Sequence, residues 1–209
     1  MGDKIVENIT DLLLEVIGYL TPITYLILLF SFFLKEKITF NIPSIFDNEL
    51  LLLIALYGFG YLLRSLSIYL GVKRPFNIQK KIIDELSQKS SYKKAKETLI
   101  VENNLDDNIT YSEIRNICLG KYPDISNKVY LFMFRSSLFF DLFIINLLFL
   151  IGILFDYLFS SSLFEISFES GVLVIIMIIL MIPLLKARKR FFEISYKIPI
   201  SNYLSKNLK

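Results

Sequence analysis

The sequence predicts an all-α polytopic membrane protein, with four transmembrane helices and a small helical cytoplasmic insertion between the second and third. Three observations lead to this prediction. Hydrophobic residues make up 54% of the 209 residues, and the mean hydropathy is +0.55. The apolar residues gather in four long blocks instead of alternating with polar ones. Charged residues, 21% of the chain, are concentrated between these blocks. An ordinary soluble globule, a disordered chain and a disulfide-rich scaffold are therefore excluded.

The four apolar blocks cover residues 12–34, 50–70, 132–159 and 171–185. A helix needs about 20 apolar residues to cross the hydrocarbon core of a bilayer, so the first three are long enough. The fourth becomes long enough if its helix starts near Phe168 and its basic end extends to the headgroups. The first block is longer than a signal-peptide core and follows acidic residues, so we expect a retained helix.

The distribution of basic residues predicts the orientation. Residues 71–128 contain eleven Lys or Arg and the tail from Lys186 contains seven, whereas residues 160–170 contain none and residues 35–49 only two. Cytoplasmic loops carry the excess of Lys and Arg in membrane proteins. The sequence therefore predicts a multi-pass protein of the cell inner (plasma) membrane with cytoplasmic N and C termini, which requires an even number of spans.

Four segments follow from this topology. They are an N-terminal pair of transmembrane helices, a basic helical cytoplasmic region, a C-terminal pair of transmembrane helices and a basic cytoplasmic tail, at residues 1–70, 71–128, 129–185 and 186–209. We expect the tail to continue the fourth span as a helix until Pro199 ends it.

The cytoplasmic region has helical patterning. Ile78, Ile82 and Leu86 repeat at helical spacing, a second, weaker helix is expected around residues 92–100, and Thr110 with Glu113 has the form of a capping box that begins another. These helices carry little apolar surface. We therefore expect them to pack on one another, on the tail or on neighbouring subunits.

Ionisable residues inside a bilayer are costly and are functional candidates by default. Glu15, Arg64 and Asp141 lie within predicted spans, all towards the cytoplasmic side. Arg64 and Asp141 each lie about 9 Å deep, so a salt bridge between the second and third spans is expected. One interpretation is functional, with Arg64 at a gate, in an ion path or in contact with a phosphate. The other is a structural pair that fixes the register of the two helices, which is the commoner role of such pairs.

The second span also carries a seam suited to helix packing. Tyr57 and Tyr61 fall on the same face as Arg64, with Gly60 beside them. Small and polar residues at such positions allow close approach and hydrogen bonding between membrane helices.

Two basic clusters are candidate contacts for a partner protein or for anionic lipid. One is Lys93, Lys94 and Lys96 in the cytoplasmic region, and the other is Arg188, Lys189 and Arg190 in the tail. A specific nucleic-acid partner is not predicted, because the basic excess is typical of cytoplasmic loops.

The sequence offers no equipment for catalysis. Histidine is absent, and the motifs of serine hydrolases, P-loop enzymes, zinc proteases and dinucleotide-binding enzymes are missing. The single cysteine, Cys118, has no histidine to activate it and is expected to be a partly buried, inert thiol. We therefore expect no catalytic residues, no metal and no cofactor, and a protein that is not an enzyme.

Two functions remain open. The first is an oligomeric, channel-like or membrane-permeabilising effector controlled through its cytoplasmic helices, with homo-oligomers supplying the helices that one chain lacks. The second is a non-conducting anchor or sensor subunit that recruits a soluble partner. The layout is similar to that of small four-span membrane components of bacteria and of phage defence, which implies antiviral defence as a setting. No motif carries this resemblance.

Overall fold

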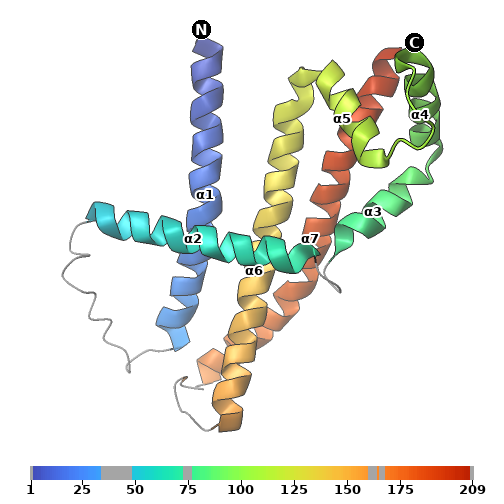
Figure 1. The fold of residues 1–209 in the computed structure, drawn as a ribbon. Coiled ribbons are helices and arrows are strands. Elements are labelled where there is room, and N and C mark those ends of the chain that lie inside the picture. The colour runs from blue at the N-terminus through green and yellow to red at the C-terminus, as the bar shows by residue number, and fades with distance from the viewer. Residues whose placement is uncertain (1, 34–48, 73–76, 160–163, 165–167, 208–209) are drawn as a thin grey trace. The chain divides into compact units, whose positions relative to one another are not determined.

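The computed structural model describes residues 2–33, 49–72, 77–159, 164 and 168–207, and of residues 2–15, 49, 50 and 72 it describes the backbone alone. All secondary structure in these ranges is helical, as the sequence predicts. Figure 1 shows the elements, which in chain order are α1 (Gly2–Phe33), α2 (Glu49–Val72), α3 (Ile78–Ser87), α4 (Ser90–Asn103), α5 (Tyr111–Lys121), the 3-10 turn η2 (Pro123–Ile125), α6 (Ser126–Phe159) and α7 (Phe168–Asn207).

Four helices of the described chain, α1, α2, α6 and α7, are long and apolar enough to cross a membrane. The four predicted apolar helices are thereby confirmed, including the fourth, which does begin at Phe168. Helices α6 and α7 have 34 and 40 residues. Since about 20 residues suffice to cross a bilayer, both helices are longer than a span requires.

Helix α7 does not end at Pro199, contrary to the sequence prediction, but continues to Asn207. A proline in a helix interior costs about 3 kcal/mol, because it removes a backbone hydrogen bond and its ring clashes with the preceding turn. Here Ile200 and Tyr203, which follow the proline, are both buried. Burying a large apolar side chain contributes about 1.5–3 kcal/mol, so these two residues offset the cost of the proline.

The chain forms two compact units. The apolar unit comprises residues 1–69 and 138–185, and the lobe comprises residues 70–137 and 186–209. Helices α6 and α7 contribute residues to both units. The lobe therefore contains the basic segment that the sequence singles out, together with the beginning of α6 and the end of α7.

In the apolar unit, helices α1, α6 and α7 share one hydrophobic cluster. Its buried members are Leu29, Phe33, Ile145, Phe149 and Met177. The ring centroids of Phe33 and Phe149 lie 5.1 Å apart, within the range of favourable aromatic contacts.

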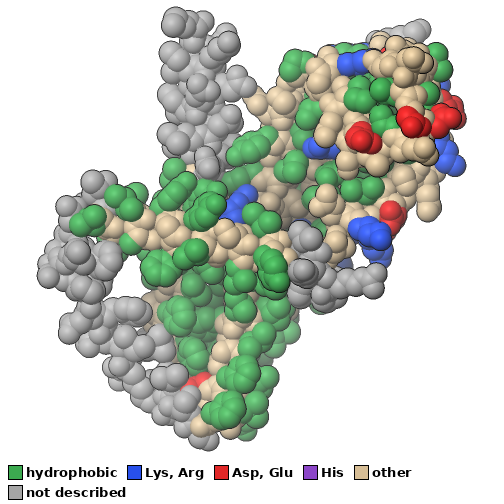
Figure 2. All heavy atoms as spheres, viewed as in Figure 1, with side chains coloured by type: hydrophobic (Ala, Val, Ile, Leu, Met, Phe, Trp, Pro, Cys, Tyr) green, Lys and Arg blue, Asp and Glu red, His purple; other side chains and the backbone are tan. Residues whose placement is uncertain are grey.

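The lobe has a core of its own, to which α3, α4, α5 and α7 all contribute. Its buried members are Ile82, Leu86, Tyr92, Ala95, Leu99, Tyr111, Ile114, Cys118, Tyr196, Ile200 and Tyr203. The expected packing of the short helices on one another and on the tail is present. Figure 2 shows apolar side chains along α2 and α6, whereas most charged side chains gather on the lobe.

The local signals that start the lobe helices act as predicted. The hydroxyl of Thr110 accepts a hydrogen bond from the Glu113 backbone N–H at 3.3 Å, and the Glu113 carboxylate accepts one from the Thr110 N–H at 2.7 Å. This reciprocal capping box begins α5. At the start of α3, the Asn77 side chain accepts from the Lys80 N–H at 3.2 Å.

Candidate functional site

The predicted ion pair of Arg64 and Asp141 is present in the apolar unit. Nη1 of Arg64 in α2 lies 3.2 Å from Oδ2 of Asp141 in α6. The Asp141 side chain is 2% exposed and the Arg64 side chain 17% exposed. Each charge thus has an opposite charge within the same chain, and the carboxylate has almost no access to solvent or lipid.

The seam of Tyr57, Gly60 and Tyr61 lies against α1, at Tyr19. The Tyr19 ring centroid is 4.9 Å from that of Tyr57 and 5.7 Å from that of Tyr61. The Arg64 guanidinium lies 5.6 Å from the same ring centroid, a distance typical of cation–π contacts. The seam packs against another helix, as expected.

Gly60 allows the close approach of α1 and α2. A Cβ atom at this position would collide with the carbonyl oxygen of Tyr19, whereas a Cβ atom at Gly58 would meet nothing within 4 Å. In Figure 1, α2 runs across α1. A crossing of this kind concentrates the contact on few residues, so the missing side chain of Gly60 matters at that point.

Three polar residues of the apolar unit were not anticipated. The Tyr25 hydroxyl donates to Oδ1 of Asn146 at 2.7 Å, linking α1 to α6. Asp156 lies within the third predicted span and is buried, so the set of ionisable candidates in the spans was incomplete. Its carboxylate accepts a hydrogen bond from the Phe164 N–H at 3.1 Å. The signal was available, because Asp156 interrupts an otherwise apolar run.

Glu15, the third predicted intramembrane charge, lies in α1. Its side chain is outside the described part of the structure, so its predicted role stays a prediction. The acidic residue Glu165 and the connector at residues 34–48 also lie outside the described residues.

The basic residues predicted to contact a partner or lipid differ in their surroundings. Lys93 and Lys94 are exposed on α4, whereas Lys96 donates to the backbone carbonyl of Asp107 at 2.6 Å. Because Lys96 already has a hydrogen-bond partner, Lys93 and Lys94 are the two cations of this cluster that are exposed to bind a partner.

The tail cluster is likewise divided. Arg188 is buried, and its carbonyl oxygen accepts from the Ser136 hydroxyl at 2.9 Å. Its burial does not fit the predicted surface contact. Nζ of Lys189 lies 3.5 Å from the Glu85 carboxylate, and Arg190 is exposed.

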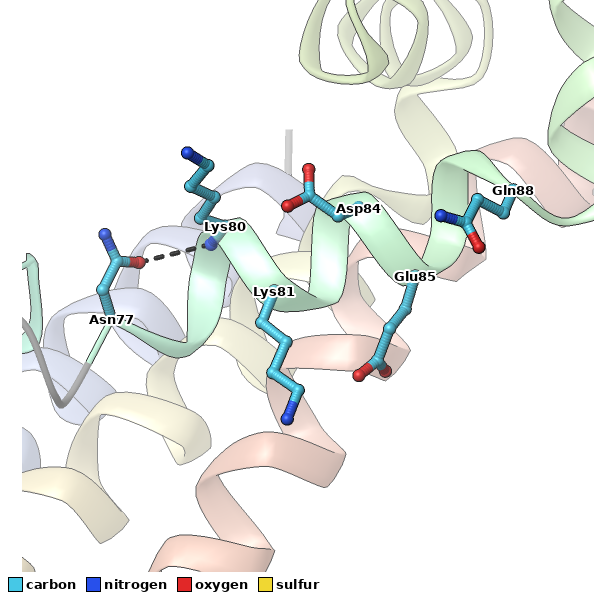
Figure 3. Close-up of a pocket in the computed structure, with 6 residues that line it drawn as sticks. All are labelled: Asn77, Lys80, Lys81, Asp84, Glu85 and Gln88. Carbon is cyan, nitrogen blue, oxygen red and sulfur yellow. Dashed lines mark hydrogen bonds between the residues drawn. The ribbon is translucent and has the colours of Figure 1, made fainter.

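A shallow groove follows the outer surface of α3, where Asn77, Lys80, Lys81, Asp84, Glu85 and Gln88 line it. In Figure 3, Lys80 and Asp84 extend to one side of the helix and Lys81 and Glu85 to the other. All six side chains come from α3 and its two cap residues, so no second element faces a ligand. Glu85 also has a partner in Lys189. The groove is therefore a solvated helix surface.

Tyr196 of α7 joins the polar groups of the lobe interior. Its hydroxyl accepts a hydrogen bond from the Gln79 amide at 3.1 Å, and its backbone carbonyl accepts one from the Tyr111 hydroxyl at 3.2 Å. The Arg115 guanidinium lies 4.6 Å from its ring centroid. Burial lowers the pKa of Arg115 from its ordinary value. No sequence pattern distinguishes this arginine from the surface cations around it.

The surroundings of Cys118 do not favour a reactive thiol. Cys118 is buried in the lobe core, and burial raises the pKa of its thiol to about 11. A thiol with so high a pKa is mostly protonated at neutral pH and reacts poorly. No group of three or more Cys, Asp and Glu side chains in the described ranges is arranged to hold a metal ion.

No protein-family model, curated protein or solved structure matches the chain. Its function is therefore inferred from its own residues.

Proposed function

We propose that this protein is a non-enzymatic, non-conducting membrane anchor whose lobe recruits a soluble partner protein at the cytoplasmic surface. The observation that carries the proposal is the lobe core, in which Tyr196, Ile200 and Tyr203 of the tail pack with α3, α4 and α5. A unit with its own core presents a defined surface to a partner. Loops that merely connected spans would not need one.

The proposed location is the inner (plasma) membrane, with the lobe and both termini in the cytoplasm. Eighteen basic residues lie in residues 71–128 and in the tail, against two in the connectors assigned to the opposite side. This asymmetry supports the orientation by the positive-inside rule. Four described helices are long and apolar enough to cross a membrane, which supports the even number of spans that the orientation requires.

The ion pair favours an anchor over a pore. A residue that gates or lines an aqueous path needs access to water, whereas the Asp141 side chain is 2% exposed and contacts Arg64 of the same chain. The pair therefore supports the structural alternative, in which it fixes the register of α2 and α6. In some other proteins, buried polar or charged groups are retained because they specify one helix register, and not only because they add stability.

The experiment reverses the two exposed charges of α4. Lys93→Glu with Lys94→Glu should abolish co-purification of the partner from native membranes and leave membrane insertion unchanged. Lys128→Glu is the control, since Lys128 is also exposed but lies in α6. Equal loss of the partner in control and test variants would contradict a specific role for α4. Failure to recover any partner from cross-linked native membranes would contradict the proposal itself.

A second candidate is the oligomeric, channel-like or membrane-permeabilising effector, with antiviral defence as its setting. It is favoured by exposed apolar side chains on α7, among them Ile178, Ile179 and Ile182, which helices of other copies would cover. Liposomes containing the purified chain should then release a trapped dye, and Arg64→Ala should abolish the release or make it permanent. An oligomer that leaks under no condition would leave the anchor as the better proposal.

A further inference from the structure

One exposed cation of the lobe lies beside two aromatic rings that come from different helices. Arg135 is exposed on α6. Its guanidinium carbon lies 5.8 Å from the ring centroid of Phe132 and 5.9 Å from that of Phe191. These two rings, from α6 and α7, are stacked with centroids 6.0 Å apart. The guanidinium is thus held at an aromatic pair while its outer face stays open.

Arg135 lies at the end of the apolar stretch of α6. Leu138, the first residue of α6 that belongs to the apolar unit, lies three positions further along, a rise of about 4.5 Å. From residue 138 to residue 155 the only charged side chain is Asp141, which pairs with Arg64. If α6 crosses the membrane, Arg135 lies at the depth of the lipid headgroups.

Two further cations lie at the same level on α7. The hydrogen bond from the Ser136 hydroxyl to the Arg188 carbonyl fixes the register of the two helices. Lys186 and Arg190 are two residues to either side of Arg188, about 3 Å along the axis, and both are exposed. Among the described residues, neither they nor Arg135 form an ion pair with a carboxylate. The lobe therefore carries a belt of three cations, formed by Arg135, Lys186 and Arg190.

We infer that this belt, with Arg135 at its centre, binds the phosphate headgroups of anionic phospholipids in the cytoplasmic leaflet. A guanidinium matches phosphate oxygens in a bidentate geometry and is weakly hydrated. The neighbouring aromatic rings are the residue type that lies between headgroups and acyl chains. Lys93 and Lys94 of α4 lack this setting, because no apolar span adjoins them. The inference rests on the proposed membrane placement of α6 and α7.

The test measures lipid binding by the full-length chain in detergent with native mass spectrometry. Phosphatidylglycerol should bind more tightly than phosphatidylcholine, and Arg135→Gln should weaken phosphatidylglycerol binding about fivefold. Lys80→Gln, which also removes one exposed charge but lies on the solvated surface of α3, should leave the affinity unchanged. Arg135→Lys should retain part of the affinity, because it keeps the charge and loses the planar geometry. If Arg135→Gln does not fold, Lys186→Gln with Arg190→Gln tests the same belt.

Three results would overturn the inference. The first is equal affinity of the belt and control variants, and the second is equal affinity for the two lipids. The third is displacement of phosphatidylglycerol by millimolar inorganic phosphate, which would indicate a site for soluble anions.

Carbonate extraction of native membranes separates this inference from the proposed function. Release of the chain by carbonate would contradict the membrane placement, whereas retention without lipid discrimination would contradict the headgroup site alone.

Discussion

The buried charges of the apolar unit depend on each other. Asp141 lies almost wholly out of solvent, and its partner Arg64 also contacts the ring of Tyr19. In a medium of low dielectric, an unpaired carboxylate or guanidinium is far more costly than in water. Each residue therefore neutralises the charge of the other. Removing one of them should reduce stability more than exchanging the two charges between the helices.

Substitutions at the pair should show this asymmetry. Arg64→Met should destabilise the apolar unit by about 3–5 kcal/mol, because Asp141 is left buried without a counter-charge. Exchanging the charges, Arg64→Asp with Asp141→Arg, should recover a substantial part of the loss. Thermal unfolding in detergent measures both, with Lys94→Met as a control for removing an exposed cation. A stability of Arg64→Met equal to that of the control would show that the pair contributes nothing.

A second residue-scale prediction concerns the pH dependence of the lobe. Hydrogen bonds from Thr110 hold the pKa of the Glu113 carboxyl below its ordinary value of 4.5. A carboxyl whose pKa is lower in the folded state stabilises the fold above its unfolded pKa, and this contribution is lost as pH falls through the folded pKa. Urea unfolding monitored by circular dichroism should thus show lower stability at pH 3.5 than at pH 6.

Glu113→Gln should reduce this pH dependence, because the amide does not titrate. Glu97→Gln is the control, since Glu97 is exposed on α4 and has no capping role. An unchanged pH profile in Glu113→Gln would indicate that the capping box contributes no proton linkage.

At the scale of helices, the sequence predicted elements whose causes are local. The capping box of Thr110 and Glu113 needs only two residues at fixed spacing, and it is present. The error at Pro199 has the opposite origin, because the continuation of α7 depends on burial of Tyr203 against α4 and α5. The sequence of a helix does not reveal tertiary contacts of this kind, although they stabilise it.

The contact of α1 with α2 yields a prediction with an internal control. Gly60→Ala should destabilise the apolar unit, since the added methyl group would collide with the backbone of Tyr19. Backbone atoms cannot rotate away as a flexible side chain would, so the helices must separate. Gly58→Ala adds the same group two residues earlier in open space, and its higher helix propensity should make it neutral or stabilising.

A disulfide cross-linking assay between α1 and α2, in a Cys118→Ser background, reports their separation directly, and thermal unfolding reports the energetic effect. Equal behaviour of the two alanine variants in both measurements would contradict the close approach at Gly60.

At the scale of the whole molecule, the sequence predicted charge placement better than packing partners. The Arg64–Asp141 pair followed from depth alone, because Arg64 lies six positions before the end of its apolar block and Asp141 lies six positions after Arg135. Tyr19, which contacts the pair, was not anticipated, since nothing in α2 specifies which residue of α1 it meets. Arg188 was predicted to contact a partner or lipid at the surface, whereas it is buried. Its burial depends on tertiary packing, which composition does not encode.

The membrane topology is the last prediction, and the sole cysteine makes it testable. In a Cys118→Ser chain, an impermeant maleimide applied to intact cells should label Ser161→Cys, in the connector after α6. The same reagent should label Ser91→Cys in the lobe and a cysteine added at the N terminus only after permeabilisation. This pattern follows because an even number of spans places the N terminus and the lobe on the same side, and the basic excess favours the cytoplasm.

The N-terminal label distinguishes four spans from three. Because α2 runs across α1 (Figure 1), an arrangement in which α2 lies along the membrane surface is the main structural alternative. It would place the N terminus and Ser91 on opposite sides, whichever way the chain is oriented. Opposite labelling of these two positions would therefore remove α2 from the set of spans. The Arg64–Asp141 pair would then be assigned to the cytoplasmic boundary of the membrane, where an arginine reaches water at little cost.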